Sequence, residues 1–128
     1  MGAKHVNDET YIAGESLVGK QYYIGTGAGA RALTVAGGAT EALVGVIQEP
    51  VADGRPCRVR DLGISLVVSD GNAGTIAAGD WLTSDAAGKA VKTVTDGNVV
   101  IGRALGASTT DGAIIEVDMK GISTHYTA

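Results

Sequence analysis

The sequence predicts an all-β domain, a small compact barrel or sandwich of short strands with an extended N-terminal arm. Short runs rich in Val, Ile and Thr have the length and composition of strands. Asp-Gly pairs, which favour turn residues with positive φ, lie between these runs at four places. No segment shows sustained helical periodicity. These three observations together favour short strands joined by tight turns.

The predicted arm comprises residues 1–19. This segment is polar and has few β-branched residues before Ile12. A terminus of this kind is either a flexible tail or an arm that becomes ordered on a partner, and the sequence leaves both interpretations open. Residues 20–128 form the predicted single β domain, because the whole chain has the length of one domain.

Nine runs within this domain are predicted strands, bounded by glycine, proline and aspartate. In chain order they are 21–24, 32–35, 42–48, 56–60, 64–69, 81–83, 90–95, 99–104 and 113–119. The Asp-Gly pairs that mark predicted hairpins or loops are 53–54, 70–71, 96–97 and 111–112.

An internal echo links two parts of the chain. Residues 43–60 contain a strand, the pair Asp53-Gly54 and a second strand, and residues 100–118 repeat this pattern around Asp111-Gly112 with one extra residue. Two similar strand-turn-strand units would suit a pseudo-symmetric barrel. Common hairpin chemistry also produces such likeness, so duplication stays open.

The composition restricts both the core and the partners. With 20 Gly, no Phe and 4% aromatic residues, the core must be filled by Val, Ile, Leu and Ala. A core this thin gains stability from further burial between subunits, so we expect a homo-oligomer. The net charge of −4 argues against nucleic-acid binding, which needs clustered Lys and Arg.

The single cysteine, Cys57, has no partner for an internal disulfide, which fits folding in a reducing cytoplasm. Because it lies in an alternating apolar run, we expect a buried and inert thiol. No run approaches the roughly 18 apolar residues of a membrane span. The polar N-terminus is also unlike a secretory signal, so we expect neither a membrane contact nor a cleaved leader.

The sequence contains segments that partly match catalytic or cofactor-binding motifs, but each lacks an essential part of the motif. The segment from Gly25 to Arg31 resembles a phosphate loop, but its third glycine comes one residue early and a strand follows it. Residues 70–74 lack the alternating ligands of a calcium loop. His5 and His125 lie at opposite ends of the chain, with no triad or metal set around them. We therefore expect no enzymatic activity, no cofactor and no metal.

Three aromatic residues are candidates for contact with a partner, because aromatic side chains dominate interface energetics. Trp81 begins a run whose alternation places it with Thr83 on one face and Leu82 on the other. It is either a core plug or a partly exposed anchor. Tyr22 and Tyr23 are adjacent, so on a strand one ring points inward and the other outward, and the outward ring is a second candidate anchor.

A charge pattern adds further candidates. Arg58 and Arg60 share one face of a predicted strand, and the echoed strand has Glu116 and Asp118 at the matching positions. If these strands meet, within one subunit or across a rotation axis, they form a ladder of opposite charges. A solvated face is the alternative. The candidate interface residues, including those of the arm, are Lys4, His5, Tyr11, Tyr22, Tyr23, Arg58, Arg60, Trp81, Glu116 and Asp118.

Three motifs resemble the capsid cement, or decoration, proteins of tailed bacteriophages. They are Gly79-Asp80-Trp81-Leu82, the turn Asp85-x-x-Gly-Lys and the strand Ile101-Gly102-Arg103-Ala104. The resemblance implies a structural virion protein that binds the outer surface of the expanded head and stabilises it. Its partners would be the major capsid protein and further copies of itself, with a trimer favoured. It would be synthesised in the host cytoplasm and located on the virion.

The alternative function is a small carbohydrate- or ligand-binding β module on a virion or cell surface. Such a module would need exposed aromatic residues along a groove, and this chain has few aromatic residues. A glycosidase is a third possibility, for which Asp80 with Asp85, or Glu116 with Asp118, would have to flank a sugar cleft. Solvated charges explain these acids more simply.

Overall fold

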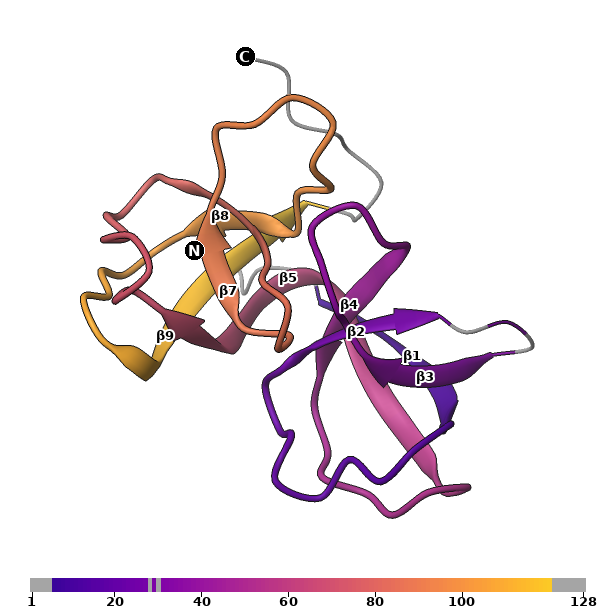
Figure 1. The fold of residues 1–128 in the computed structure, drawn as a ribbon. Helices are drawn as coiled ribbons and strands as arrows, with labels where there is room; N and C mark the ends of the chain where they lie inside the picture. Colours follow the sequence, from indigo (N-terminus) through magenta and orange to yellow (C-terminus); the bar gives the residue numbers. More distant parts are fainter. Residues whose placement is uncertain (1–5, 28, 30, 121–128) are drawn as a thin grey trace.

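The computed structural model describes residues 6–27, 29 and 31–120, and within them it is all β, with no helix (Figure 1). The strands are β1 (Asn7–Ala13), β2 (Ile24–Gly27), β3 (Ala32–Val35), β4 (Leu43–Ile47), β5 (Pro56–Asp70), β6 (Trp81–Ser84), β7 (Ala90–Lys92), β8 (Gly102–Ala104) and β9 (Asp111–Lys120). They belong to one sheet in the order β1-β3-β2-β4-β5-β7-β6-β8-β9.

This sheet closes on itself twice. In the first ring, β1, β3, β2, β4 and the first half of β5 follow one another, and β1 also pairs with β5. In the second ring, the last half of β5 is followed by β7, β6, β8 and β9, and β9 pairs back to β5. The 15-residue β5 therefore belongs to both rings and runs from one lobe of the molecule to the other (Figure 1).

The two rings have the same topology and equivalent registers. In each ring one strand pair is parallel, with Ala13 opposite Leu33 in the first and Ser69 opposite Ala90 in the second. The other pairs are antiparallel in both rings. The echoed segments form the equivalent pairs β4–β5 and β8–β9. The structure thus contains the internal pseudo-symmetry that the sequence left open.

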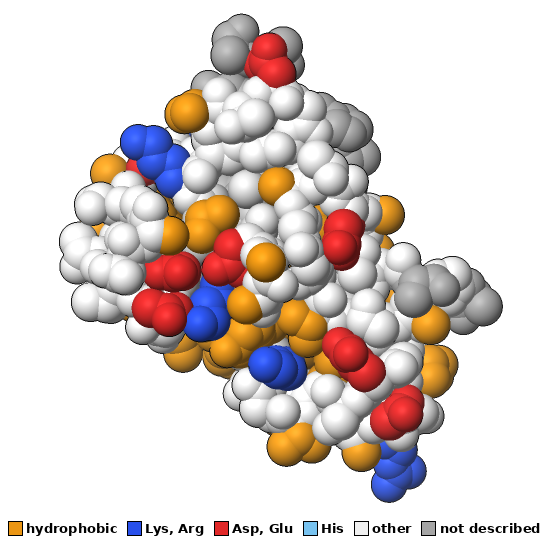
Figure 2. Space-filling model, viewed as in Figure 1, with side chains coloured by type: hydrophobic (Ala, Val, Ile, Leu, Met, Phe, Trp, Pro, Cys, Tyr) orange, Lys and Arg blue, Asp and Glu red, His pale blue; other side chains and the backbone are white. Residues whose placement is uncertain are grey.

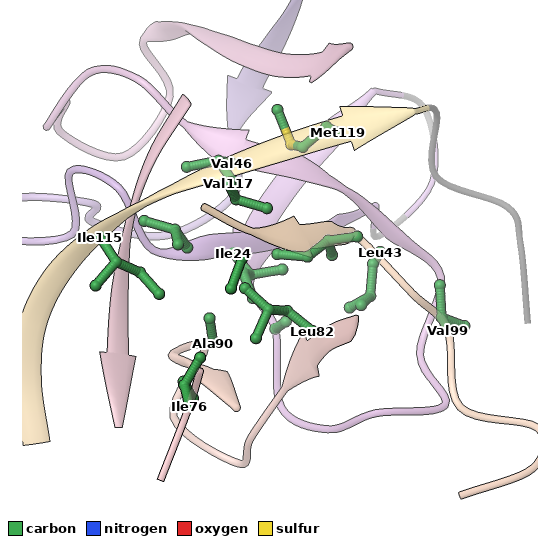
Figure 3. Close-up of a cluster of buried hydrophobic side chains, with 14 residues drawn as sticks. Ile24, Leu43, Val46, Ile76, Leu82, Ala90, Val99, Ile115, Val117 and Met119 are labelled. Carbon is green, nitrogen blue, oxygen red and sulfur yellow. The ribbon is translucent and has the colours of Figure 1, made fainter. Parts of the chain in front are cut away.

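Two hydrophobic clusters fill the rings. The first ring encloses Ala13, Leu17, Leu33, Ile47, Cys57 and Val59. The larger cluster contains inward residues of the second ring, such as Leu82 and Val117, together with Ile24, Leu43 and Val46 from β2 and β4 (Figure 3). The outer face of β2 and β4 therefore packs against the second ring, and this contact joins the two lobes.

Several predicted strands differ from the observed ones. The predicted run 32–35 matches β3, whereas runs 56–60 and 64–69 are parts of the single strand β5. Gly63, with a φ of 92°, lies within β5 where its pairing passes from β1 to β9. The predicted run 21–24 is not a strand before Ile24, because Tyr22 has a positive φ of 69° and ends any regular alternation there.

Part of the predicted arm lies within the first ring. Residues 7–13 form β1, which pairs antiparallel with β5 and parallel with β3. Ala13 and Leu17 are buried in the first cluster, and Tyr11 packs against it. These few apolar side chains, together with the ladder hydrogen bonds, are enough to hold a polar segment in the sheet. Residues 1–5 lie outside the described part of the chain.

Candidate interaction surface

The outer face of the first ring is held together by an ion-pair network. Asp8 of β1 accepts hydrogen bonds from Arg60 Nε at 2.8 Å and from Arg60 Nη2 at 3.2 Å. Arg58 contacts Asp8 at 3.3 Å and Glu49 at 3.3 Å. The hydrogen bonds to Asp8 raise the pKa of Arg60 above its ordinary value. The charges on this face are therefore compensated within the chain.

The opposite-charge ladder predicted within one subunit does not form. The register of β5 and β9 places Glu116 opposite Leu66 and Asp118 opposite Ile64, whereas the two arginines lie in the half of β5 that pairs with β1. The physical reason is the length of β5, which lets its two halves take different partners. Contact between these charges across two subunits stays a prediction.

The outer face of the second ring is different in character. The side chains of Leu66 on β5, of Leu105 just after β8 and of Ile114 on β9 are 38%, 45% and 54% exposed. They surround Glu116, because Glu116 lies opposite Leu66 and its carbonyl accepts a 2.9 Å hydrogen bond from the Leu105 amide. We call this surface, formed by Leu66, Arg103, Leu105, Ile114, Glu116 and Asp118, the β5–β9 face.

Trp81 extends this surface onto β6. It lies opposite Arg103, whose guanidinium is 4.5 Å from the centre of the indole ring. Leu82 is fully buried in the second cluster, as the alternation predicts, but Thr83, which the alternation placed on the face of Trp81, is buried as well. Trp81 itself is half-buried and lies outside both core clusters. It is therefore a side chain of the outer face and not a core plug.

The tyrosines are placed differently from the prediction. Because of the positive φ at Tyr22, the two adjacent rings do not alternate inward and outward. Tyr22 packs against the second cluster and Tyr23 against the first, and both are half-buried. Contact of either tyrosine ring with a partner stays a prediction.

Tyr11 of the arm is also half-buried. It packs against the first cluster, and the guanidinium of Arg31 lies 4.7 Å from the centre of its ring. Arg31 Nη2 also donates a 2.6 Å hydrogen bond to the carbonyl of Thr10. The other two arm candidates, Lys4 and His5, lie outside the described residues.

Three further observations concern metal binding, the cysteine and membrane spans in the described residues. They contain no group of three or more His, Cys, Asp and Glu side chains that could hold a metal ion. The thiol of Cys57 is buried, and this burial raises its pKa. The same residues include no helix with the length and apolar character needed to span a bilayer. On the face shown in Figure 2, hydrophobic, acidic and basic side chains are interspersed.

The motif residues singled out in the sequence build turns. Asp80 Oδ2 accepts a 2.8 Å hydrogen bond from the Ala77 amide. Asp85 Oδ1 accepts hydrogen bonds from the amides of Ala87 at 2.8 Å and Lys89 at 2.9 Å. These carboxylates therefore satisfy backbone donors on either side of β6, as aspartate commonly does in turns.

Sequence reasoning missed the exposed apolar residues of the β5–β9 face. Leu66 and Ile114 lie in runs that are apolar at both odd and even positions. Alternation alone then cannot say which face turns inward. A partial signal was present in Glu116 and Asp118, which mark the outward face of β9.

Comparisons with known proteins agree with this fold. A family model described as phage cement protein matches residues 13–119. Among solved structures, the head fiber gp8.5 N base of bacteriophage phi29 superposes with a TM-score of 0.67 at 20% sequence identity. The match covers 94% of this chain and 100% of that chain, and at this identity it shows the fold alone. No curated protein sequence matches the chain.

Proposed function

This chain belongs to the phage cement protein family, and from this premise we propose that it binds the outer surface of the expanded phage head and stabilises the shell. Family membership gives the chain a structural role at the capsid. The family match over residues 13–119, which covers every strand except most of β1, is the observation that carries the proposal.

The proposed mechanism is stabilisation by binding. A ligand that binds only the assembled state of a protein shell stabilises that state by its own binding free energy. A compact domain that bridges neighbouring capsid subunits would oppose their separation under the pressure of a packaged genome. This mechanism needs contact area and shape, and no reactive group.

Self-association belongs to the same proposal. The chain has two small cores without a phenylalanine, so burial between copies would add stability that each ring lacks. We favour a trimer, because capsids offer three-fold and quasi-three-fold sites and because linked copies bind with higher avidity. The major capsid protein is the proposed partner.

The test is to add the purified protein to expanded heads that lack it. We expect saturable binding and a higher temperature of head disruption. Unexpanded heads are the control, since a cement protein that acts after expansion should bind them less. Absence of binding to expanded heads, or binding to glycans alone, would contradict the proposal and favour a carbohydrate-binding module.

Oligomeric state is measured separately. Light scattering gives the mass of the free protein, and the number of copies bound per head at saturation gives the occupied positions. A trimer predicts three times the chain mass, in solution or on the shell. A monomeric stoichiometry in both measurements would contradict self-association while leaving head binding intact.

A further inference from the structure

We propose that the β5–β9 face is the surface that contacts the phage head, and that it binds a capsid surface presenting a Lys or Arg side chain framed by apolar ones. This inference rests on the proposed function and adds to it the face that binds and the chemistry that it recognises.

Equivalent positions on the outer faces of the two rings differ in polarity. Arg58 lies opposite Thr10 in the first ring, as Glu116 lies opposite Leu66 in the second. The amide of Gln48 donates to the carbonyl of Arg58 at 2.9 Å, as the amide of Leu105 donates to that of Glu116. Thr10 and Gln48 are polar, whereas their counterparts Leu66 and Leu105 are apolar. These two equivalent positions are therefore polar, as expected of a solvated surface, in the first ring and apolar, as expected of a contact surface, in the second ring.

The exposed apolar side chains of the β5–β9 face lie close together, unlike the other exposed apolar side chains described. Val18 and Val94 are even more exposed, at 66% and 61%, and Ile12 of β1 is 43% exposed, but no strand pairing places any of these three beside another. Isolated exposed apolar residues are normal on protein surfaces, whereas a contiguous group of them marks an interaction site. Leu66, Leu105 and Ile114 instead gather around Glu116: Leu66 lies opposite it on the paired strand, Ile114 is its neighbour on the same face of β9, and Leu105, which directly follows β8, donates its amide to the Glu116 carbonyl.

The charge at the centre of the β5–β9 face is the carboxylate of Glu116. Within the described part of the chain, the carboxylate of Glu116 forms no ion pair, although exposed apolar side chains surround it. A partner that covers these side chains would also cover the carboxylate. Burial of a charge is tolerated when an opposite charge meets it, so the partner should supply a Lys or Arg.

The same reasoning disfavours a second copy of this chain as the occupant. Most of the described cations are already engaged: Arg31, Arg58, Arg60 and Lys89 form ion pairs, Arg103 lies over Trp81 and Lys20 over Tyr23, which leaves Arg55 and Lys92 as those that a second copy could offer. A capsid surface with a basic side chain is therefore the better complement.

The test uses purified full-length variants and expanded heads that lack the protein. Glu116→Lys and Ile114→Ser should each weaken head binding by at least about tenfold, because one removes a charge contact and the other an apolar contact. Glu116→Gln should reduce the salt dependence of binding. Asp53→Lys and Val94→Ser make matched changes at exposed loop positions away from the β5–β9 face, and we expect wild-type affinity from both.

The outcomes separate this inference from the proposed function. Failure of the wild-type protein to bind heads would overturn the proposed function and, with it, this inference. Wild-type binding with unchanged affinity in both Glu116→Lys and Ile114→Ser would overturn the inference alone. If these variants lose self-association but bind heads normally, the occupant is a second copy and the inference is again wrong. Thermal unfolding checks that each variant is folded, and Glu116→Gln provides the readout if Ile114→Ser does not fold.

Discussion

Gly45 and Gly102 occupy equivalent positions in the two rings, and each lies against the backbone of the equivalent neighbouring strand. A Cβ on Gly45 would overlap the carbonyl oxygen of Arg60, and a Cβ on Gly102 would overlap that of Asp118. Both glycines also have positive φ, 146° and 158°. The internal repeat seen in the sequence thus includes two glycines, each of which lets the neighbouring strand backbone approach closely.

Replacement of either glycine by alanine should destabilise the protein. In Gly45→Ala and Gly102→Ala the new methyl group must displace a strand backbone, at a cost of at least about 2 kcal/mol each. Gly38 has open space around its Cβ position, so Gly38→Ala is the matched control and should change the free energy of unfolding by less than about 0.5 kcal/mol. Urea unfolding measures all three. Equal stability of Gly45→Ala and Gly38→Ala would contradict the proposed clash.

In the two rings the large core side chain comes from different strands of the equivalent strand pair, from β3 in the first ring and from β6 in the second. A Cβ on Gly25 would lie 2.7 Å from Leu33 Cδ1, so the small residue on β2 makes room for the large one on β3. In the second ring Leu82 takes the position equivalent to Gly25, and Ala90 takes the position equivalent to Leu33.

This exchange predicts compensation. Leu33→Ala should cost about 2 to 5 kcal/mol, because it leaves a cavity in the first ring. Adding Gly25→Leu to Leu33→Ala should recover part of that loss, although Gly25→Leu alone should be destabilising. A double-mutant cycle from chemical unfolding measures the coupling. Additive losses would contradict the idea that the two arrangements are interchangeable.

The pair of Asp8 and Arg60 should hold β1 onto the first ring. Both side chains are mostly buried, so we expect Asp8→Ala to cost about 1 to 2 kcal/mol in the free energy of unfolding. Glu9→Ala breaks the more exposed pair with Arg31 and should cost only a few tenths of a kcal/mol. Amide hydrogen exchange across residues 7–13 should rise in Asp8→Ala but little in Glu9→Ala. The reverse order of effects would show that the network does not hold the strand.

The thiol of Cys57 should be unreactive in the native protein. Its pKa is raised chiefly by burial, so the neutral thiol is favoured in the folded state. Stability from this group is present below the ordinary thiol pKa and is lost as pH rises above it, because the unfolded chain then ionises first. A disulfide reagent at pH 8 should label the native protein slowly and the denatured protein at once. Rapid native labelling would contradict the burial, and Cys57→Ala should remove this contribution to the pH dependence.

Local signals predicted much of the strand content. β3 and the start of β5 coincide with predicted runs, because alternating apolar residues and flanking turn residues lie next to one another in the sequence. Of the Asp-Gly pairs, Gly54, Gly97 and Gly112 have the positive φ that such turns favour. Gly71 differs, since it has no positive φ and a Cβ there would instead overlap the backbone carbonyl of Ser108.

The candidate contact residues were harder to place. Alternation along β6 is a local property and predicts the burial of Leu82, but it also placed Thr83 on the face of Trp81, and Thr83 is buried. The ionic partner of Arg60 was not foreseen, since Asp8 lies far away in the sequence and reaches it through the pairing of β1 with β5. The exposure of Leu66 and Ile114 also depended on which side of β5 and β9 encloses the core.

The sequence by itself determined an all-β chain, the positions of several turns, a buried cysteine and the motifs shared with phage cement proteins. These properties depend on neighbouring residues, whose spacing fixes backbone angles and alternation. Only the tertiary structure decided that β5 serves two rings, that part of the arm is a strand, and that the β5–β9 face is apolar around Glu116. The reason is that strand pairing joins residues distant in sequence, and a period of two defines two faces without saying which one is buried.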